Sequence, residues 1–150
     1  MTDEALAFDL PDLAAMAALG QQIAAAARPG DVVALSGTLG SGKTTLAREM
    51  IAALGHDGEV PSPSFTIIET YDQLPLPVVH ADFYRLERPL EAAQLGLDDY
   101  REGALLIAEW PENAGGFAHE PGCLSLSLEI VGEGRKAIAR CGADWHGRFP

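Results

Sequence analysis

The stretch GTLGSGKT at residues 37–44 constrains the fold more than any other part of the chain. It fits the pattern of a glycine, four residues and then Gly-Lys-Thr, and it joins an apolar run to a run with helical spacing. Its glycines allow the backbone to bend so that successive N–H groups point inward at phosphate oxygens. The N-terminus of the following helix adds free N–H groups and a positive dipole end. The stretch therefore predicts a phosphate-binding loop between a buried strand and a helix.

Individual residues of this loop have distinct expected roles. The Lys43 ammonium can reach the β- and γ-phosphates of a nucleotide, and the Thr44 hydroxyl can ligate Mg²⁺. The alternative is a glycine-rich turn without a ligand, but the strand-like run before the motif and the helix-like run after it favour the phosphate site. The loop residues predicted to bind nucleotide are Gly37, Gly40, Ser41, Gly42, Lys43 and Thr44.

Strand and helix patterns alternate along the first two-thirds of the chain. Helices are predicted over residues 11–28, 41–54 and about 89–102, and strands over 31–37, 65–71 and 104–110. Residues 77–86 are predicted to be a further strand that opens into a loop. Nearer the C-terminus, residues 123–141 read as a hairpin around the turn GEG. We therefore predict a single α/β domain of P-loop NTPase type over residues 1–150. Its sheet is expected to be mostly parallel and flanked by helices, with antiparallel hairpin additions at 65–82 and 123–141.

The charge balance restricts what such a domain can bind directly. The chain has 22 acidic residues against 10 basic ones, a formal net charge of -12, and its lysines are Lys43 and Lys136 alone. A protein that binds nucleic acid by itself needs several basic side chains on the phosphates. We therefore expect any nucleic acid that this protein serves to be held by a partner. The alternative is that the acidity serves solubility only.

The remaining bulk features predict a soluble cytoplasmic protein without membrane contact. No apolar run approaches the roughly 18 residues that a bilayer requires. The acidic N-terminus carries no recognisable secretion signal. Cys123 and Cys141 lack metal-ligand spacing, so we expect both to be reduced and structural.

A phosphate-binding loop of this kind needs an acid at the end of another strand, where it holds Mg²⁺ or polarises water. Glu109 ends the run ALLIAE and Asp82 ends the run PVVHAD. The run before Glu109 is the more uniformly apolar, which predicts a central strand and places this acid beside the loop. Asp82 is then expected to hold Mg²⁺ indirectly or to fix a loop that senses the γ-phosphate. The alternative for each acid, taken by itself, is that it is simply a solvent-exposed carboxylate at the end of a strand.

These considerations give a predicted catalytic set and a predicted metal site. The catalytic residues are Lys43, Asp82 and Glu109, and the metal ligands are Thr44 and Glu109. The identity of the nucleobase is inferred from the absence of a sequence motif. GTPases recognise guanine with the sequence N-K-x-D, and neither lysine of this chain lies in such a sequence. ATP with Mg²⁺ is therefore the expected ligand, and the segment before the loop is where adenine contacts are sought.

Taken in order along the chain, the loop, PSPSF, HADFYRL and IAEWPE resemble the bacterial TsaE (YjeE) family. That family comprises small P-loop ATPases required for threonylcarbamoyl modification of the adenosine beside the anticodon in certain tRNAs. The resemblance extends from about residue 13 to the hairpin near residue 140. It implies that the chain binds a TsaB–TsaD partner pair, which performs the transfer, while ATP hydrolysis drives a conformational cycle.

The resemblance also carries roles onto single residues. It adds Thr45 and Ser64 to the predicted nucleotide-binding residues, with Ser64 standing where the family usually has threonine. It gives Asp82 and Glu109 as the functional acids, in agreement with the strand-end reasoning. The other matching positions are His80, Tyr84, Arg85, Leu86, Trp110, Pro111 and Glu112.

Three of the matching positions keep a structural alternative. His80 is equally well explained as a packed histidine at a strand end. Trp110 is either structural or a reporter of the site. Arg85 either contacts phosphate or forms an ordinary ion pair.

Three function classes follow. The leading hypothesis is an ATPase subunit that powers or resets a tRNA-modifying complex and meets tRNA only indirectly. A small-molecule or nucleotide kinase is the alternative, although the chain shows no arginine-rich insertion of the size of a closing lid. The third class is a nucleotide-sensing module with negligible turnover.

Overall fold

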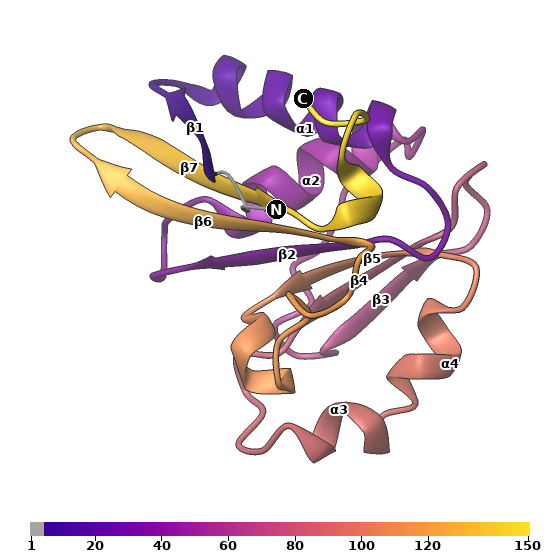
Figure 1. The fold of residues 1–150 in the computed structure, drawn as a ribbon. Helices are drawn as coiled ribbons and strands as arrows, with labels where there is room; N and C mark the ends of the chain where they lie inside the picture. The colour runs from indigo at the N-terminus through magenta and orange to yellow at the C-terminus, as the bar shows by residue number, and fades with distance from the viewer. Residues whose placement is uncertain (1–4) are drawn as a thin grey trace.

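The computed structural model describes residues 5–150, which form a seven-stranded mixed sheet with helices on both faces (Figure 1). The strands are β1 (Ala5–Leu10), β2 (Val32–Gly37), β3 (Ile68–Tyr71), β4 (Val78–Asp82), β5 (Leu105–Glu109), β6 (Cys123–Val131) and β7 (Gly134–Cys141). The helices are α1 (Leu13–Ala26), α2 (Lys43–Ala53), α3 (Leu90–Gln94) and α4 (Leu97–Arg101), with 3₁₀ turns at Pro111–Ala114 and Ala143–Trp145. Within this part of the chain, no helix combines the length and the apolar character needed to cross a membrane.

The strand order explains how residues from distant segments meet at one edge of the sheet. The strands lie in the order β1-β7-β6-β2-β5-β4-β3. β6, β2, β5 and β4 run parallel, and antiparallel strands extend the sheet at both sides. Because Leu35 and Asp82 both pair with Glu109, the carboxyl ends of β2, β5 and β4 lie side by side. The predicted α/β fold, with a parallel centre and antiparallel hairpin additions, is confirmed.

Side chains of the central strands alternate between two apolar cores, one on each face of the sheet. Val33 and Leu35 of β2 pack in the core that α1 and α2 cover, whereas Val32 and Ala34 pack in the core that α3 and α4 cover. All five residues of β5 are buried, as expected for a parallel strand covered on both faces. A polar side chain in these strands is therefore enclosed unless it lies at a strand end.

Helices α1 and α2 pack closely against each other and so set the position of the loop that precedes α2. Asp12 caps α1, because its Oδ1 accepts a hydrogen bond from Ala15 N at 2.9 Å. Gly20 of α1 faces α2, where an added Cβ would lie 2.7 Å from the Cβ of Glu49. A larger residue at this position would push α2 away, and with it Lys43, the first residue of α2.

Two predicted elements were wrong in extent. The helix expected over about 89–102 is two short helices, because Gly96 takes a left-handed φ of 81° between them. The strand expected over 65–71 begins only at Ile68. Before it the chain makes a turn in which Ile67 has a φ of 69° and its N–H bonds to Pro63 O at 2.7 Å.

Strand β1 was not predicted at all. Its residues alternate, with Leu6, Phe8 and Leu10 packing against the core under α1 and α2. It pairs antiparallel with β7 and thereby leads the chain to the start of α1. This connection brings the N-terminal segment beside the phosphate-binding loop.

Candidate nucleotide site

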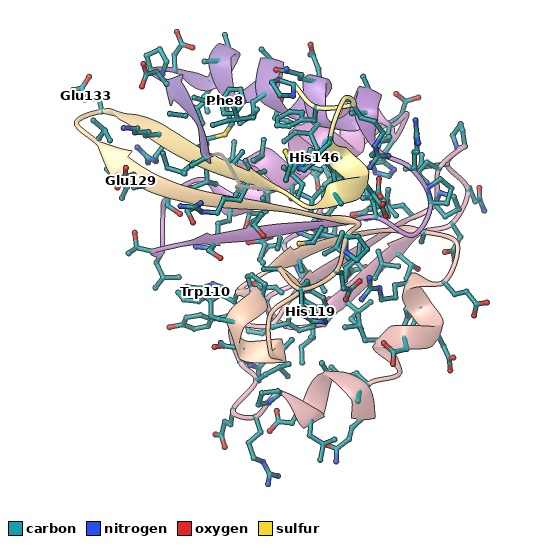
Figure 2. The ribbon with its side chains drawn as sticks, in the orientation of Figure 1. Phe8, Trp110, His119, Glu129, Glu133 and His146 are labelled. Atoms are coloured by element: carbon teal, nitrogen blue, oxygen red, sulfur yellow. The ribbon has the colours of Figure 1, made fainter. Side chains whose placement is uncertain are left out.

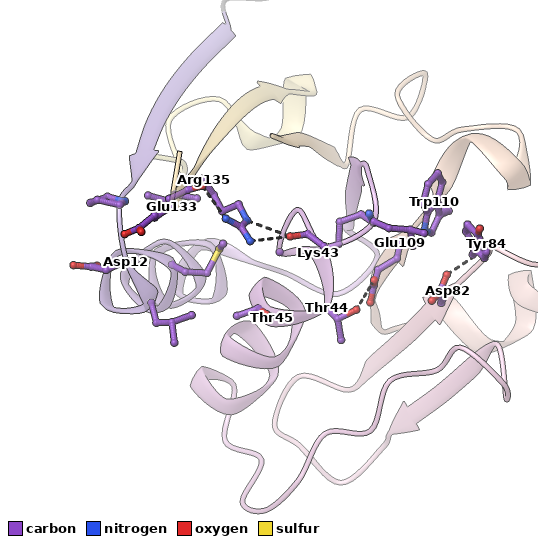
Figure 3. A pocket seen from close by; sticks show the side chains of 18 of the residues that line it. Asp12, Lys43, Thr44, Thr45, Asp82, Tyr84, Glu109, Trp110, Glu133 and Arg135 are labelled. Atoms are coloured by element: carbon purple, nitrogen blue, oxygen red, sulfur yellow. Dashed lines mark hydrogen bonds between the residues drawn. The ribbon is translucent and has the colours of Figure 1, made fainter. Parts of the chain in front are cut away.

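The GTLGSGKT loop lies between the end of β2 and the start of α2, as predicted (Figure 3). Gly37 has a φ of 142°, and an added Cβ would lie 2.4 Å from Leu128 O. Gly42 has a φ of 107°, and its Cβ would lie 2.7 Å from Met16 Cε. Gly37 therefore requires glycine both for its backbone conformation and for space, whereas Gly42 requires it for its backbone conformation.

Lys43 is the charged centre of the loop. Its ammonium donates hydrogen bonds to Gly37 O at 2.6 Å and to Thr38 O at 2.8 Å, and it lies 4.5 Å from the centroid of the Trp110 ring. Burial lowers the pKa of Lys43, while the charges of nearby acids, Glu109 first, oppose that shift. The loop thus holds a desolvated cation at the start of a helix.

Glu109 meets the loop from β5. Its Oε1 accepts a hydrogen bond from Thr44 Oγ1 at 2.7 Å, and its Oε2 lies 2.7 Å from His80 Nε2. Only 2% of Glu109 is exposed. The register between β2 and β5 places it, since Leu35 lies opposite Glu109 two residues before the loop begins.

Asp82 lies beside Glu109 at the end of β4. Its Oδ1 accepts a hydrogen bond from Tyr84 N at 3.0 Å, and its Oδ2 accepts one from Ser64 Oγ at 3.4 Å. Burial raises the pKa of Asp82, and the charge of Glu109 raises it further. The bond from Ser64 ties the loop before β3 to the edge of the sheet, so that this loop and the acid form one wall.

These groups line one end of a cleft of about 560 Å³, a size suited to a nucleotide (Figure 3). Predicted site residues that line it are Gly40, Gly42, Lys43, Thr44, Thr45, Ser64, Asp82 and Glu109. Gly37 and Ser41 do not line it. The Ser41 side chain is fully buried and its Oγ has no partner among the described residues, so only the Ser41 backbone is available to a ligand.

The residues of the opposite wall of the cleft were not predicted individually from the sequence. It comes from the β1–α1 junction and from the tip of the β6–β7 hairpin, where Glu133 lies (Figure 2). Arg135 donates from Nε and Nη2 to Gly40 O, at 3.2 and 2.9 Å, and so links the hairpin to the phosphate-binding loop. No local pattern predicts this contact, because it joins residues far apart in sequence. The residues of this wall are Leu10, Pro11, Asp12, Leu13, Met16, Glu133, Gly134 and Arg135.

The site fits a Mg²⁺ ion that is shared with phosphate groups. Within residues 5–150, no group of three or more His, Cys, Asp or Glu side chains could hold a metal alone. Mg²⁺ commonly takes one or two carboxylates and completes its octahedral shell with water and phosphate oxygens, at about 2.0–2.1 Å. Thr44 Oγ1 and Glu109 Oε1, 2.7 Å apart, have the chemistry and the spacing of neighbouring ligands in such a shell.

The other candidate residues lie away from the cleft or against its wall. The Arg85 guanidinium lies over the Phe65 ring at 5.9 Å, and Arg85 does not line the cleft. Trp110 does line it, with its ring edge-on to Tyr84 at 4.9 Å. His119 and His146 are exposed on turns (Figure 2).

Comparisons with known proteins agree with this geometry. Residues 10–138 match the family model described as threonylcarbamoyl adenosine biosynthesis protein TsaE. The tRNA threonylcarbamoyladenosine biosynthesis protein TsaE of Synechocystis is 38% identical over 117 residues, covering 75% of this chain and 74% of the relative. The protein of the same name from Rickettsia felis is 33% identical over 119 residues, covering 79% and 69%.

The fold leads to the same family. The crystal structure of YdiB from Bacillus subtilis superimposes with a TM-score of 0.78 at 29% sequence identity, covering 95% of this chain and 88% of that one. The match includes both the parallel centre that presents the loop and the antiparallel strands beside it. The family model covers the loop, both strand-end acids and most of the β6–β7 hairpin. The chain therefore belongs to the TsaE family of tRNA threonylcarbamoyladenosine biosynthesis proteins.

Proposed function

We propose that this chain binds ATP with Mg²⁺ in the cleft and hydrolyses it, and that the hydrolysis supports threonylcarbamoyl modification of the adenosine beside the anticodon in tRNA. The observation that carries the proposal is the 2.7 Å contact between Thr44 Oγ1 and Glu109 Oε1 in the wall that also presents Lys43. It joins a phosphate-binding loop to a strand-end acid, which is the combination that P-loop phosphoryl transfer requires.

Each side chain in this wall has a separate task. When bound, Mg²⁺ neutralises charge on the β- and γ-phosphates. Thr44 and Glu109 hold the ion, and the desolvated Lys43 ammonium supplies positive charge to the same phosphates. We assign the orientation of the attacking water to Asp82, because burial raises its pKa and so makes its carboxylate the stronger base. Ser64, bonded to Asp82, then connects the state of the phosphates to the loop before β3.

The far end of the cleft suits the nucleoside. Leu10, Leu13 and Met16 contribute apolar side chains on this side of the cleft, where Arg135 joins the hairpin to the loop through Gly40 O. Nucleoside sites combine such apolar surfaces with a few polar groups. We therefore place the adenine between the start of α1 and the β6–β7 hairpin, in the N-terminal region where the sequence reasoning sought it.

A partner complex, the TsaB–TsaD pair, is proposed to perform the transfer and to hold the tRNA. The chain has 22 acidic residues and only 10 basic ones, and this negative net charge disfavours direct binding to RNA phosphates. Apolar side chains are instead exposed around the cleft, where Phe65 is 87% and Leu39 67% accessible. Exposed apolar surface of this kind is typical of protein contacts. A role on tRNA also agrees with the cytoplasmic location expected from the sequence.

ATP turnover measured under three conditions tests the proposal. The protein is assayed alone, with small-molecule phosphate acceptors, and with purified TsaB and TsaD. We expect release of inorganic phosphate that rises when the TsaB–TsaD pair is added. Transfer of the γ-phosphoryl group to an acceptor would identify a kinase, and nucleotide binding without turnover in all conditions would identify a sensing module. Either result would overturn the proposal.

A further inference from the structure

His80 lies in β4, behind the wall of the cleft, and does not itself line the cleft. Its side chain is fully buried, and its Nε2 lies 2.7 Å from Oε2 of Glu109. Asp82 pairs with Glu109 across the parallel strands, and His80 precedes Asp82 by two residues on the same face of β4. His80 therefore reaches the Glu109 carboxylate from inside the fold, on the side away from Thr44.

The hydrogen-bonding capacity of Glu109 determines which imidazole nitrogen carries the hydrogen. An ionised carboxylate only accepts hydrogen bonds, so Nε2 of His80 must donate. The other nitrogen, Nδ1, is buried and has no partner among the described residues. A hydrogen on Nδ1 would be a buried donor without a partner, which is costly. The surroundings thus favour the tautomer that carries its hydrogen on Nε2.

We infer that His80 is a positioning residue whose Nε2–H fixes the carboxylate of Glu109 in the orientation that presents Oε1 to Thr44. Each Glu109 oxygen then has its own partner, and rotation of the carboxylate would break both hydrogen bonds at once. The inference rests on the proposed function, in which Glu109 and Thr44 hold Mg²⁺. Side chains that orient metal ligands in this way commonly contribute about 10–100-fold to metal affinity or activity.

A histidine that only fills space in the core would behave differently on substitution. Its replacement would lower thermal stability, but it would leave the Mg²⁺ dependence of nucleotide binding as it is. The distinguishing readout is therefore the ratio of ATP affinity with Mg²⁺ to ATP affinity without it, measured by titration calorimetry on the whole chain.

Two substitutions distinguish the loss of the hydrogen-bond donor of His80 from the loss of side-chain volume. In His80→Gln, the amide nitrogen reaches the place of the imidazole Nε2, whereas in His80→Asn it reaches only the place of Nδ1. We expect His80→Asn to reduce the Mg²⁺ enhancement of ATP affinity, and the ATP turnover with TsaB and TsaD, by about 10–100-fold. His80→Gln is expected to recover most of both losses. Trp145→Phe is the matched control, because it removes a buried hydrogen bond of 2.8 Å to Gly122 O at the opposite edge of the sheet; we expect lower stability and an unchanged Mg²⁺ enhancement.

A measurement on the unsubstituted protein keeps the inference testable even if a variant fails to fold. Long-range ¹H–¹⁵N NMR spectra distinguish the two imidazole tautomers, and we expect His80 to carry its hydrogen on Nε2. The inference is overturned by a hydrogen on Nδ1 alone, or by a folded His80→Asn variant with the Mg²⁺ enhancement and turnover of the wild type. Failure of the proposed function is recognised separately, because the wild type itself would then show no Mg²⁺-dependent binding or hydrolysis of ATP.

Discussion

Two buried charged clusters lie at opposite ends of β2, and they are built differently. At the amino end, Asp31 accepts hydrogen bonds from Arg28 N at 2.8 Å and from Arg148 Nη2 at 3.0 Å. One carboxylate meets one guanidinium, which also lies 4.5 Å over the Trp145 ring. This pair ties the C-terminal turn to the start of the central strand.

At the carboxyl end of β2, the Glu109 and Asp82 carboxylates lie near the Lys43 ammonium, which donates its hydrogen bonds to the loop carbonyls of Gly37 and Thr38. Burial raises the pKa of Asp82 and lowers that of Lys43, so for both groups the charged form is disfavoured in the fold. Folding alone does not require such an arrangement, whereas a bound Mg²⁺ and triphosphate would complete it. We therefore propose that the first cluster stabilises the fold, whereas the second costs stability and serves a ligand, and substitutions at each end test this proposal.

The largest effect is expected at Lys43. Lys43→Ala removes the cation that we place on the phosphates, and ATP turnover with TsaB and TsaD should fall by about 100–1,000-fold, the loss seen when a charge-stabilising group is removed. Circular dichroism should show an intact fold. The control is Lys136→Ala, which removes the other lysine, on β7 and outside the nucleotide cleft. Normal turnover in Lys43→Ala would show that the loop is not the site.

The largest effect on stability is expected at the amino end of β2. Arg148→Met leaves the buried Asp31 carboxylate without its guanidinium, which should cost about 3–5 kcal/mol of folding free energy. Thermal unfolding should report a midpoint lower by at least about 6 °C, while ATP turnover per folded molecule stays the same. Arg140→Met, at an exposed position on β7, is the control. An unchanged midpoint would show that the Asp31–Arg148 pair does not stabilise the fold, which would contradict the contrast drawn between the two ends of β2.

A smaller effect is expected at Glu109, and it should separate hydrolysis from binding. Glu109→Ala removes the strand-end acid, so we expect kcat to fall by about 100-fold, the scale of about 3 kcal/mol, with a smaller loss in ATP affinity. Single-turnover kinetics and calorimetry measure the two quantities, with the exposed Glu129→Ala as control. A loss of ATP affinity that is the same with and without Mg²⁺, and as large as the loss in kcat, would assign Glu109 a structural role instead.

The smallest effect is a gain in stability at Asp82. Because the folded-state pKa lies above the unfolded one, ionising Asp82 costs folding free energy as pH rises through the folded value, and the cost is absent below the unfolded value of about 4. Asp82→Asn should therefore unfold at a temperature about 2–4 °C higher at pH 7, the shift produced by about 1 kcal/mol. The gain should vanish as pH falls towards 4, and turnover should be impaired. Asp57→Asn, in an exposed loop, is the control. A lower unfolding midpoint for Asp82→Asn at pH 7 would contradict the expected gain in stability.

Sequence reasoning succeeded where local chemistry and strand order decide the outcome. The spacing of its glycines identifies the loop, and apolar runs that end in a carboxylate indicate the strand-end acids. The same reasoning left His80 undecided and gave no contact for Arg135, because their partners Glu109 and Gly40 come from other segments and depend on register and hairpin position.

Where secondary structure was missed, the signals were present but short. Strand β1 alternates over only six residues at the edge of the sheet, where pairing with β7 rather than local propensity determines its conformation. Gly96 breaks the predicted helix of about 89–102, and a glycine inside a helical pattern is a recognised reason to divide it. The divided helix changes only the cover of the sheet, whereas β1 leads into the β1–α1 junction that lines the cleft.

The central claim is that ATP hydrolysis in the cleft serves tRNA modification. It is tested most directly by threonylcarbamoylation of tRNA in a reconstituted mixture of TsaB, TsaD and a threonylcarbamoyl donor, with ATP. Addition of this chain should restore repeated rounds of modification, and addition of the folded Lys43→Ala variant should not. Equal modification with the wild type, with Lys43→Ala and without either would contradict the claim.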